Sequence, residues 1–348
     1  MISRPDFKVS VCAGLALAMV ASVWGSPSAQ AQTTEPAPAE QVAGEAAPRL
    51  LQEAAAAYAD YQSEVSLIRD KPISGADQLD KALTVFGAQN PAQLSAGWIA
   101  YAAMIAAQDP EFIAAVRDID SFYGRDRVMN GMRNDLGYAR TLKGGERALQ
   151  TALAVNARDT DRIAAAAAYV KDQAIKLQSV AWGKSRLKDA GGVATRLKAN
   201  ATLLRPIAEA AKKLFSGPDL HLVLADASSN GQGSVWDRVS LIAASAPAAA
   251  LNALTPAEPS SMRIDPRRES TANRIMTLAA FHILEADRTH TDEVRAAMSD
   301  KPTFDCIDWS QLQLQACVSA AYTRADLSFC LAEHAIGDAG TCFSGVAR

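Results

Sequence analysis

The side chains of Cys330, His334 and Asp338 are the set in this sequence that comes nearest to a group of metal ligands. They repeat every four residues, so a helix would carry a thiolate, an imidazole and a carboxylate on one face. Zinc binds these three ligand types. The sequence has no C-x-x-C doublet, however, and an oxidising compartment converts paired thiols to disulfides. We therefore expect structural disulfides here, with zinc as the alternative.

Ser185 and Lys188 are separated by two residues, and Ser228, Ser229 and Asn230 follow downstream. This order is similar to two of the three motifs of penicillin-binding serine enzymes, whose serine is the nucleophile and whose lysine activates it. The third motif, K-T-G, is missing further along the chain. We expect Ser185 and Lys188 to be solvated residues between helices.

His282, Glu285 and His290 form a second group with metal-ligand chemistry. Carboxylate-bridged metal bundles use Glu-x-x-His twice with further glutamates, whereas the order here is reversed and occurs once. Since His282 lies between apolar residues, we expect an edge-of-core histidine. A hydrolase would have to gather carboxylates that the sequence scatters, such as Glu285 and Asp287.

Gly231, Gln232 and Gly233 follow a short segment, His221 to Ala225, that has the alternation of a strand. A G-x-G after a strand occurs in phosphate-binding loops, but neither G-x-x-x-x-G-K-[ST] nor G-x-G-x-x-G is present here. We expect a flexible turn at these glycines.

No metal or other cofactor is expected for the protein.

Basic residues concentrate in the middle of the chain. Residues 140–215 hold 15 Lys/Arg against 6 Asp/Glu, although the whole chain has a net charge of −3. Lys198, Arg205 and Lys212 are seven residues apart, so a continuous helix would carry them as a basic stripe. The stripe is extended by four further basic residues: Lys184, Arg186, Lys188 and Lys213. We expect a surface for an anionic partner, with a merely solvated face as the alternative.

The first 31 residues have the organisation of a cleavable secretory signal. Arg4 and Lys8 precede an apolar run of about 15 residues, shorter than the roughly 20 that span a bilayer, and AQA at residues 29–31 gives a cleavage site. We expect export to a bacterial periplasm, with no transmembrane segment left after cleavage. Residues 32–48 mix Pro, Glu, Ala and Thr without periodicity, which predicts a disordered linker.

The expected mature chain has four cysteines, all near its end: Cys306, Cys317, Cys330 and Cys342. If two terminal helices form an antiparallel hairpin, the inner two cysteines lie near its turn and the outer two near its open ends. This arrangement favours Cys317 with Cys330 and Cys306 with Cys342. Sequential pairing is the alternative.

The tail contains Phe329-Cys330-Leu331, followed by His334, Asp338 and Cys342. It resembles the C-terminal region of exported alphaproteobacterial proteins of uncharacterised function. The resemblance covers only the tail, and it implies export and no activity.

Alanine supplies about a fifth of the chain and has the best helix propensity. The apolar spacing predicts an all-α fold, a bundle or irregular array of about ten helices. We expect a helical domain at 49–300 and a disulfide-stapled helical hairpin at 301–348. The expected helices are 50–70, one ending at Gly87, one starting at Pro91, one starting at Pro110, 125–136, 145–156, 159–182, 193–215 with a kink or a restart at Pro206, one capped by Ser234, 269–286, 309–322 and 324–335.

These features predict a non-catalytic periplasmic component of the cell envelope with a structural or protein-interaction role. Its partner is expected to be an envelope protein or an anionic envelope surface. Nucleic acid is not expected, because of the compartment and because no binding motif is present. The alternatives are a periplasmic carrier of an apolar small ligand and an envelope hydrolase with a deep polar cleft.

Overall fold

The computed structural model describes residues 49–229 and 262–347, which are all-α and contain no strand. The predicted signal peptide, the linker at 32–48, the glycines at 231–233 and the helix predicted at Ser234 lie outside the described residues. Within them no single helix is long and apolar enough to cross a bilayer. Only the helices 91–106 and 110–123 taken together reach that length and composition, and they are bent by 93° at their junction.

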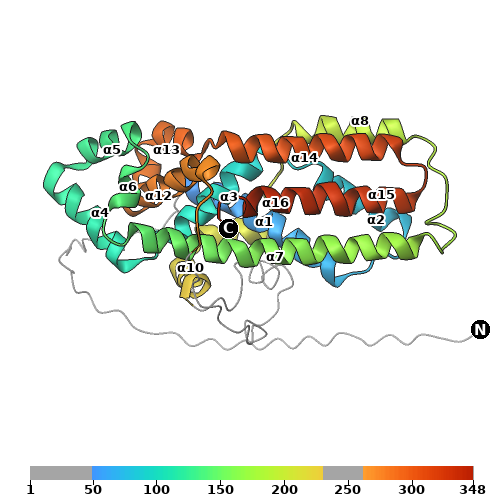
Figure 1. Cartoon of the computed structure of the whole chain (residues 1–348), viewed down its shortest axis with the longest axis horizontal. Coiled ribbons are helices and arrows are strands. Elements are labelled where there is room, and N and C mark those ends of the chain that lie inside the picture. Colours follow the sequence, from blue (N-terminus) through green and yellow to red (C-terminus); the bar gives the residue numbers. More distant parts are fainter. Residues whose placement is uncertain (1–48, 230–261, 348) are drawn as a thin grey trace, which may run out of the picture. The chain divides into compact units, whose positions relative to one another are not determined.

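The centre of the core is the packing of α1 (Leu50–Asp70) against α3 (Pro91–Ala106) (Figure 1). Helix α3 begins where predicted, because Pro91 occupies its first turn and the Asn90 side chain accepts a hydrogen bond from the backbone N–H of Gln93. Its residues are apolar nearly all round, and the helix is buried on most sides. The two backbones come close at Gly97, where an added Cβ would lie 2.7 Å from the carbonyl oxygen of Ala54.

The longest helix is α7 (Gly145–Leu177), with 33 residues and a length of about 50 Å. The prediction of two helices, 145–156 and 159–182, was wrong. No glycine or proline interrupts the chain there. The Asn156 side chain is buried and has two hydrogen bonds: it accepts from Trp98 Nε1 at 2.7 Å and donates to the Phe343 carbonyl at 2.7 Å. A residue expected to end a helix therefore joins α7 to the core.

The strand predicted at 221–225 is also wrong, because these residues belong to α10 (Leu220–Ser229). Leu220, Val223, Leu224 and Ala227 are buried, while the intervening Leu222 is 57% exposed. The buried residues are spaced by three and four, which matches the 3.6-residue period of a helix. The five residues 221–225 are too few to distinguish that period from the two-residue period of a strand.

The segment over 193–215, predicted to kink or restart at Pro206, is interrupted and restarts: it forms two helices, α8 (Ala190–Ala201) and α9 (Glu209–Ser216). Pro206 lies in the non-helical stretch between them, as its missing N–H requires. Gly191 and Gly192 are in the first turn of α8, where the Asp189 side chain accepts a hydrogen bond from the Gly192 N–H at 2.8 Å.

Four more predicted helices are present: α2 (Ala76–Gly87), α4 (Pro110–Tyr123), α5 (Arg125–Asn134) and α12 (Glu269–Ile283). Four short elements were not predicted: α6 (Tyr138–Thr141), η2 (Pro266–Arg268), η3 (Ala286–Arg288) and α13 (Thr291–Met298). Helices α1, α2, α3 and α4 begin or end at the predicted residues.

The C-terminal hairpin is confirmed, with longer helices than predicted. Helix α14 (Lys301–Ala320) runs antiparallel to a second helical rod made of α15 (Arg324–Cys330), the π-helical segment η4 (Leu331–Asp338) and α16 (Ala339–Ser344) (Figure 1). Disulfides join Cys306 to Cys342 and Cys317 to Cys330, the pairing that the hairpin geometry favours.

The hairpin also contributes to the central core. The ring of Phe343 lies 5.3 Å from that of Tyr58 and 5.9 Å from that of Trp98, centroid to centroid. Gly340 lets α16 approach α7 closely, since an added Cβ would lie 2.8 Å from Ile163 Cγ2.

Candidate surface for an anionic partner

The loop between α7 and α8, residues 178–189, is held in one position against the turn between α14 and α15. The backbone N–H of Leu187 donates to the Tyr322 carbonyl at 2.9 Å, and that of Ala325 donates to the Gly183 carbonyl at 3.0 Å. Arg186 and Thr323 form an isolated antiparallel bridge. The loop is therefore held by this contact, with turns over residues 178–184 and an extended bridge at Arg186.

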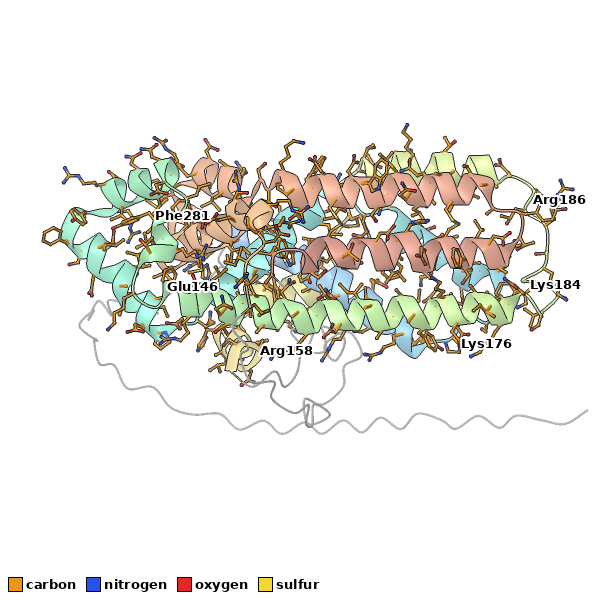
Figure 2. The ribbon with its side chains drawn as sticks, viewed as in Figure 1. Glu146, Arg158, Lys176, Lys184, Arg186 and Phe281 are labelled. Carbon is orange, nitrogen blue, oxygen red and sulfur yellow. A yellow bond between two sulfur atoms is a disulfide. The ribbon has the colours of Figure 1, made fainter. Side chains whose placement is uncertain are left out.

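The three basic residues of this loop face solvent. Arg186 lies in the bridge, Lys184 ends the turn at 181–184, and Lys188 lies in a bend. All three basic side chains are exposed, whereas Ser185 and Leu187 are partly buried. Figure 2 shows Lys184 and Arg186 at the end of the molecule where α7 finishes.

An exposed aromatic ring completes this surface. The Arg186 guanidinium lies 4.9 Å from the centroid of the Tyr322 ring, and Tyr322 is 59% exposed. This distance is within the range of a cation–π contact. We call the surface formed by Lys184, Arg186, Lys188 and Tyr322 the basic end.

Nearby carboxylates have other partners. Asp326 accepts from the backbone N–H groups of Tyr322 and Thr323 at 3.0 and 2.8 Å, and Asp189 caps α8. Within the part of the chain that the structure describes, Lys184 and Lys188 form no ion pair. The basic end therefore presents three exposed cations, of which Lys184 and Lys188 form no ion pair with a described carboxylate.

The other four predicted basic residues do not join this surface as one stripe, because the continuous helix that the seven-residue spacing requires is interrupted. Lys198 lies on α8 and Lys213 on α9. Arg205 lies in the break between them, where its guanidinium donates to the Val85 carbonyl at 2.6 Å. Lys212 forms an ion pair with Glu209 at 2.8 Å.

The Ser185 hydroxyl has structural partners rather than a lysine. It donates to the Trp182 carbonyl at 2.6 Å and accepts from Arg324 Nη1 at 2.8 Å. The Ser228 hydroxyl donates to the Ala225 carbonyl within α10. Asn230 lies outside the described residues.

The zinc alternative at Cys330, His334 and Asp338 is wrong, because the Cys330 sulfur is bonded to Cys317. The imidazole and the carboxylate do share one face, as the spacing predicts: His334 Nδ1 lies 2.7 Å from Asp338 Oδ2. Among the described residues, no group of three or more His, Cys, Asp or Glu side chains is arranged to hold a metal ion.

The groups at 282–290 have separate partners. His282 is only partly exposed and its Nδ1 is fully buried without a hydrogen bond, and burial lowers its pKa from 6.5 to about 4. Glu285, in a left-handed conformation with φ 55°, forms an ion pair with Arg49 at 3.1 Å. His290 Nε2 lies 3.8 Å from Asp126.

The two carboxylates that a hydrolase would use differ in their surroundings. Asp287 is 3% exposed, and burial raises the pKa of its carboxyl group, whereas the Arg49 contact lowers the pKa of Glu285. Two neighbouring acids with pKa values shifted in opposite directions are a feature of some acid–base sites. Here each shift has a local cause, burial for one and an ion pair for the other.

Sequence reasoning named the three loop residues but missed why they act together. The relevant signal is the alternation of K-S-R-L-K at 184–188, which has the two-residue period of an extended segment. The contribution of Tyr322 depends on a contact between residues more than a hundred positions apart, which no local pattern contains.

Comparison of the chain with protein-family models, curated proteins and solved structures gave no match.

Proposed function

We propose that this protein is a non-catalytic interaction component of the bacterial cell envelope, which docks its basic end onto an anionic envelope surface. The observation that carries the proposal is the hydrogen-bonded loop on which Lys184, Arg186 and Lys188 are exposed, with Arg186 beside an exposed tyrosine. Each Lys or Arg close to an anionic lipid surface contributes roughly 1 kcal/mol. Tyrosine is the kind of ring that lies at a lipid–water interface.

The periplasmic location rests on two independent features. The N-terminal residues have the pattern of a signal peptide, and the two disulfides are typical of an oxidising compartment. The tail's resemblance to exported alphaproteobacterial proteins points the same way. An envelope protein with an acidic surface would be recognised by the same charges and is the alternative partner.

The test is cosedimentation of the mature protein with vesicles of phosphatidylcholine alone or mixed with phosphatidylglycerol. We expect binding only to the mixed vesicles, and at least tenfold weaker binding for K184Q/R186Q/K188Q, since three contributions of roughly 1 kcal/mol are lost. The matched control is K198Q/K212Q/K213Q, which removes the same charge from exposed residues elsewhere.

Equal losses in the two triple variants would mean that net charge, and not the basic end, governs binding. No binding to either vesicle would reject the lipid surface as the partner. Crosslinking in the periplasm through residue 184 or 188 would then test for an acidic envelope protein.

A further inference from the structure

A groove of about 260 Å³ lies between the end of α1 and α2, and none of its lining residues belongs to the basic end. It is closed on one side by the turn at 71–73. Its walls come from α1, the turn and α2: Glu64, Leu67, Ile68, Lys71, Pro72, Ile73, Gln78, Lys81, Ala82, Val85 and Phe86.

The floor of this groove is apolar and well fixed. Ile68, Ile73 and Phe86 are at most 9% exposed and belong to the main core. The turn is held by Gln78, whose Oε1 accepts from the Ser74 backbone N–H at 2.8 Å and from the Ser74 hydroxyl at 2.9 Å. Leu67, at the rim, is 40% exposed. An apolar chain lying here would cover carbon that is now in contact with water.

Two lysines form the charged part of the rim. Lys71 and Lys81 are exposed, and neither forms an ion pair with a carboxylate among the described residues. The one acid in the lining is Glu64, which is half-buried. Burial and the neighbouring Asp60 raise its pKa, while Arg205 and Lys81 lower it, so Lys81 lies close enough to offset part of the charge of Glu64.

We propose that this groove binds a single-chain amphiphile with a carboxylate head, the chain lying on Ile68, Ile73 and Phe86 and the head lying between Lys71 and Lys81. A pocket with an apolar lining and a few charged groups at its mouth is the usual form of a small-ligand site. The positive rim selects an anionic head over a cationic one. The site is independent of the basic end and of its proposed docking role.

The test is equilibrium dialysis of the mature protein against monomeric dodecanoate, decanoate and octanoate, with dodecyltrimethylammonium as the cationic counterpart. We expect dodecanoate to bind more tightly than its cationic counterpart. Affinity should rise about fourfold for each methylene that the groove covers. K71Q/K81Q should bind dodecanoate about tenfold more weakly.

A second variant, A82W, fills the groove from α2 and should abolish dodecanoate binding. K198Q/K213Q is the matched control, because it removes two exposed lysines on α8 and α9 and should leave dodecanoate binding unchanged. The lysines replaced in the two double variants are exposed, so both double variants should fold. The test therefore remains valid even if A82W does not fold.

The proposal is overturned if dodecanoate binds equally to wild type and K71Q/K81Q, if folded A82W still binds it, or if the cationic amphiphile binds more tightly. Absence of dodecanoate binding up to its solubility limit overturns it as well. Vesicle binding is proposed to use other residues. None of these results therefore tests the docking proposal, which is tested by the vesicle cosedimentation.

Discussion

His282 shows how one residue can couple this fold to pH. Its Nδ1 is buried at the end of α12 without a hydrogen bond, and Arg49 lies near enough to disfavour a second positive charge. Folding therefore lowers its pKa from 6.5 to about 4. The unfolded chain therefore binds the proton more tightly than the folded protein does. As a result, His282 does not reduce the free energy of unfolding above pH 6.5, and it reduces that free energy progressively as the pH falls from 6.5 towards 4.

We expect H282Q to remove part of this acid sensitivity. The free energy of unfolding of the wild type should fall between pH 7 and pH 4.5 by up to about 2 kcal/mol more than that of H282Q, because only the wild type has this histidine to protonate. Urea titrations at the two pH values measure the difference. H221Q is the control: His221 is exposed on α10, and its removal should leave the pH dependence unchanged.

At the scale of helices, close backbone approach determines how α1 and α3 meet. Alanine-rich faces allow two helices to approach closely, and at Gly97 the approach leaves no room for a Cβ. The sequence shows the glycine inside a helical pattern, where it would ordinarily weaken the helix. Only the packing of α3 on α1 explains why a glycine is favoured there.

We expect G97A to lower the free energy of unfolding by about 2 kcal/mol or more, since the added methyl overlaps the carbonyl oxygen of Ala54 and must displace backbone. The matched control is G131A in α5, where no atom lies within 4 Å of the added Cβ. That change should stabilise the protein by about 0.5–1 kcal/mol through helix propensity. Destabilisation of equal size in both variants, measured by thermal and urea unfolding, would contradict the close approach at Gly97.

The disulfides act on the same scale, by tying α14 to the rod formed by α15, η4 and α16. Cys317–Cys330 spans 13 residues and Cys306–Cys342 spans 36. In the chain-entropy account, cross-links that close longer loops restrict the unfolded chain more. The outer disulfide should therefore stabilise the protein more than the inner one.

Unfolding of C317A/C330A and C306A/C342A checks this order. We expect losses of about 3 kcal/mol for the inner pair and about 4 kcal/mol for the outer pair. A quadruple cysteine variant should lose less than the sum if the hairpin stays docked through Phe343. A larger loss from the inner pair would show that native contacts, and not loop closure, set the contribution of each disulfide.

The whole molecule combines a negative net charge with a positive end. The chain has a net charge of −3, while the basic end presents three exposed cations that no carboxylate among the described residues neutralises. Such an asymmetric charge distribution orients a protein towards an anionic surface at short range, while its net charge opposes approach. Docking through the basic end should therefore respond strongly to salt.

We expect binding to phosphatidylglycerol vesicles to weaken steeply between about 0.05 M and about 0.5 M salt, because the Debye length shortens over that range. The K184Q/R186Q/K188Q variant should show a much shallower dependence. Cosedimentation at several salt concentrations measures both slopes. Parallel slopes for wild type and variant would show that other charges carry the interaction.

Much of the helical order could be predicted from the sequence by itself, because it depends on neighbours along the chain. Pro91 and Pro110 mark helix starts, and the spacing of the four cysteines within a hairpin favours their pairing. The charges of the 184–188 segment and their two-residue alternation are likewise legible in the sequence. Caps, breakers and periodicity act within a few residues, so a linear pattern contains them.

The tertiary structure alone decided the features that depend on residues far apart in the chain. Asn156 continues α7 because Trp98 and Phe343 satisfy its amide, and Arg205 is held at the Val85 carbonyl and not in a basic stripe. Tyr322 joins the basic end, and α1 and α2 enclose a groove, for the same reason. A side chain's final partner is set by which distant surfaces pack together, and local propensity does not specify that choice.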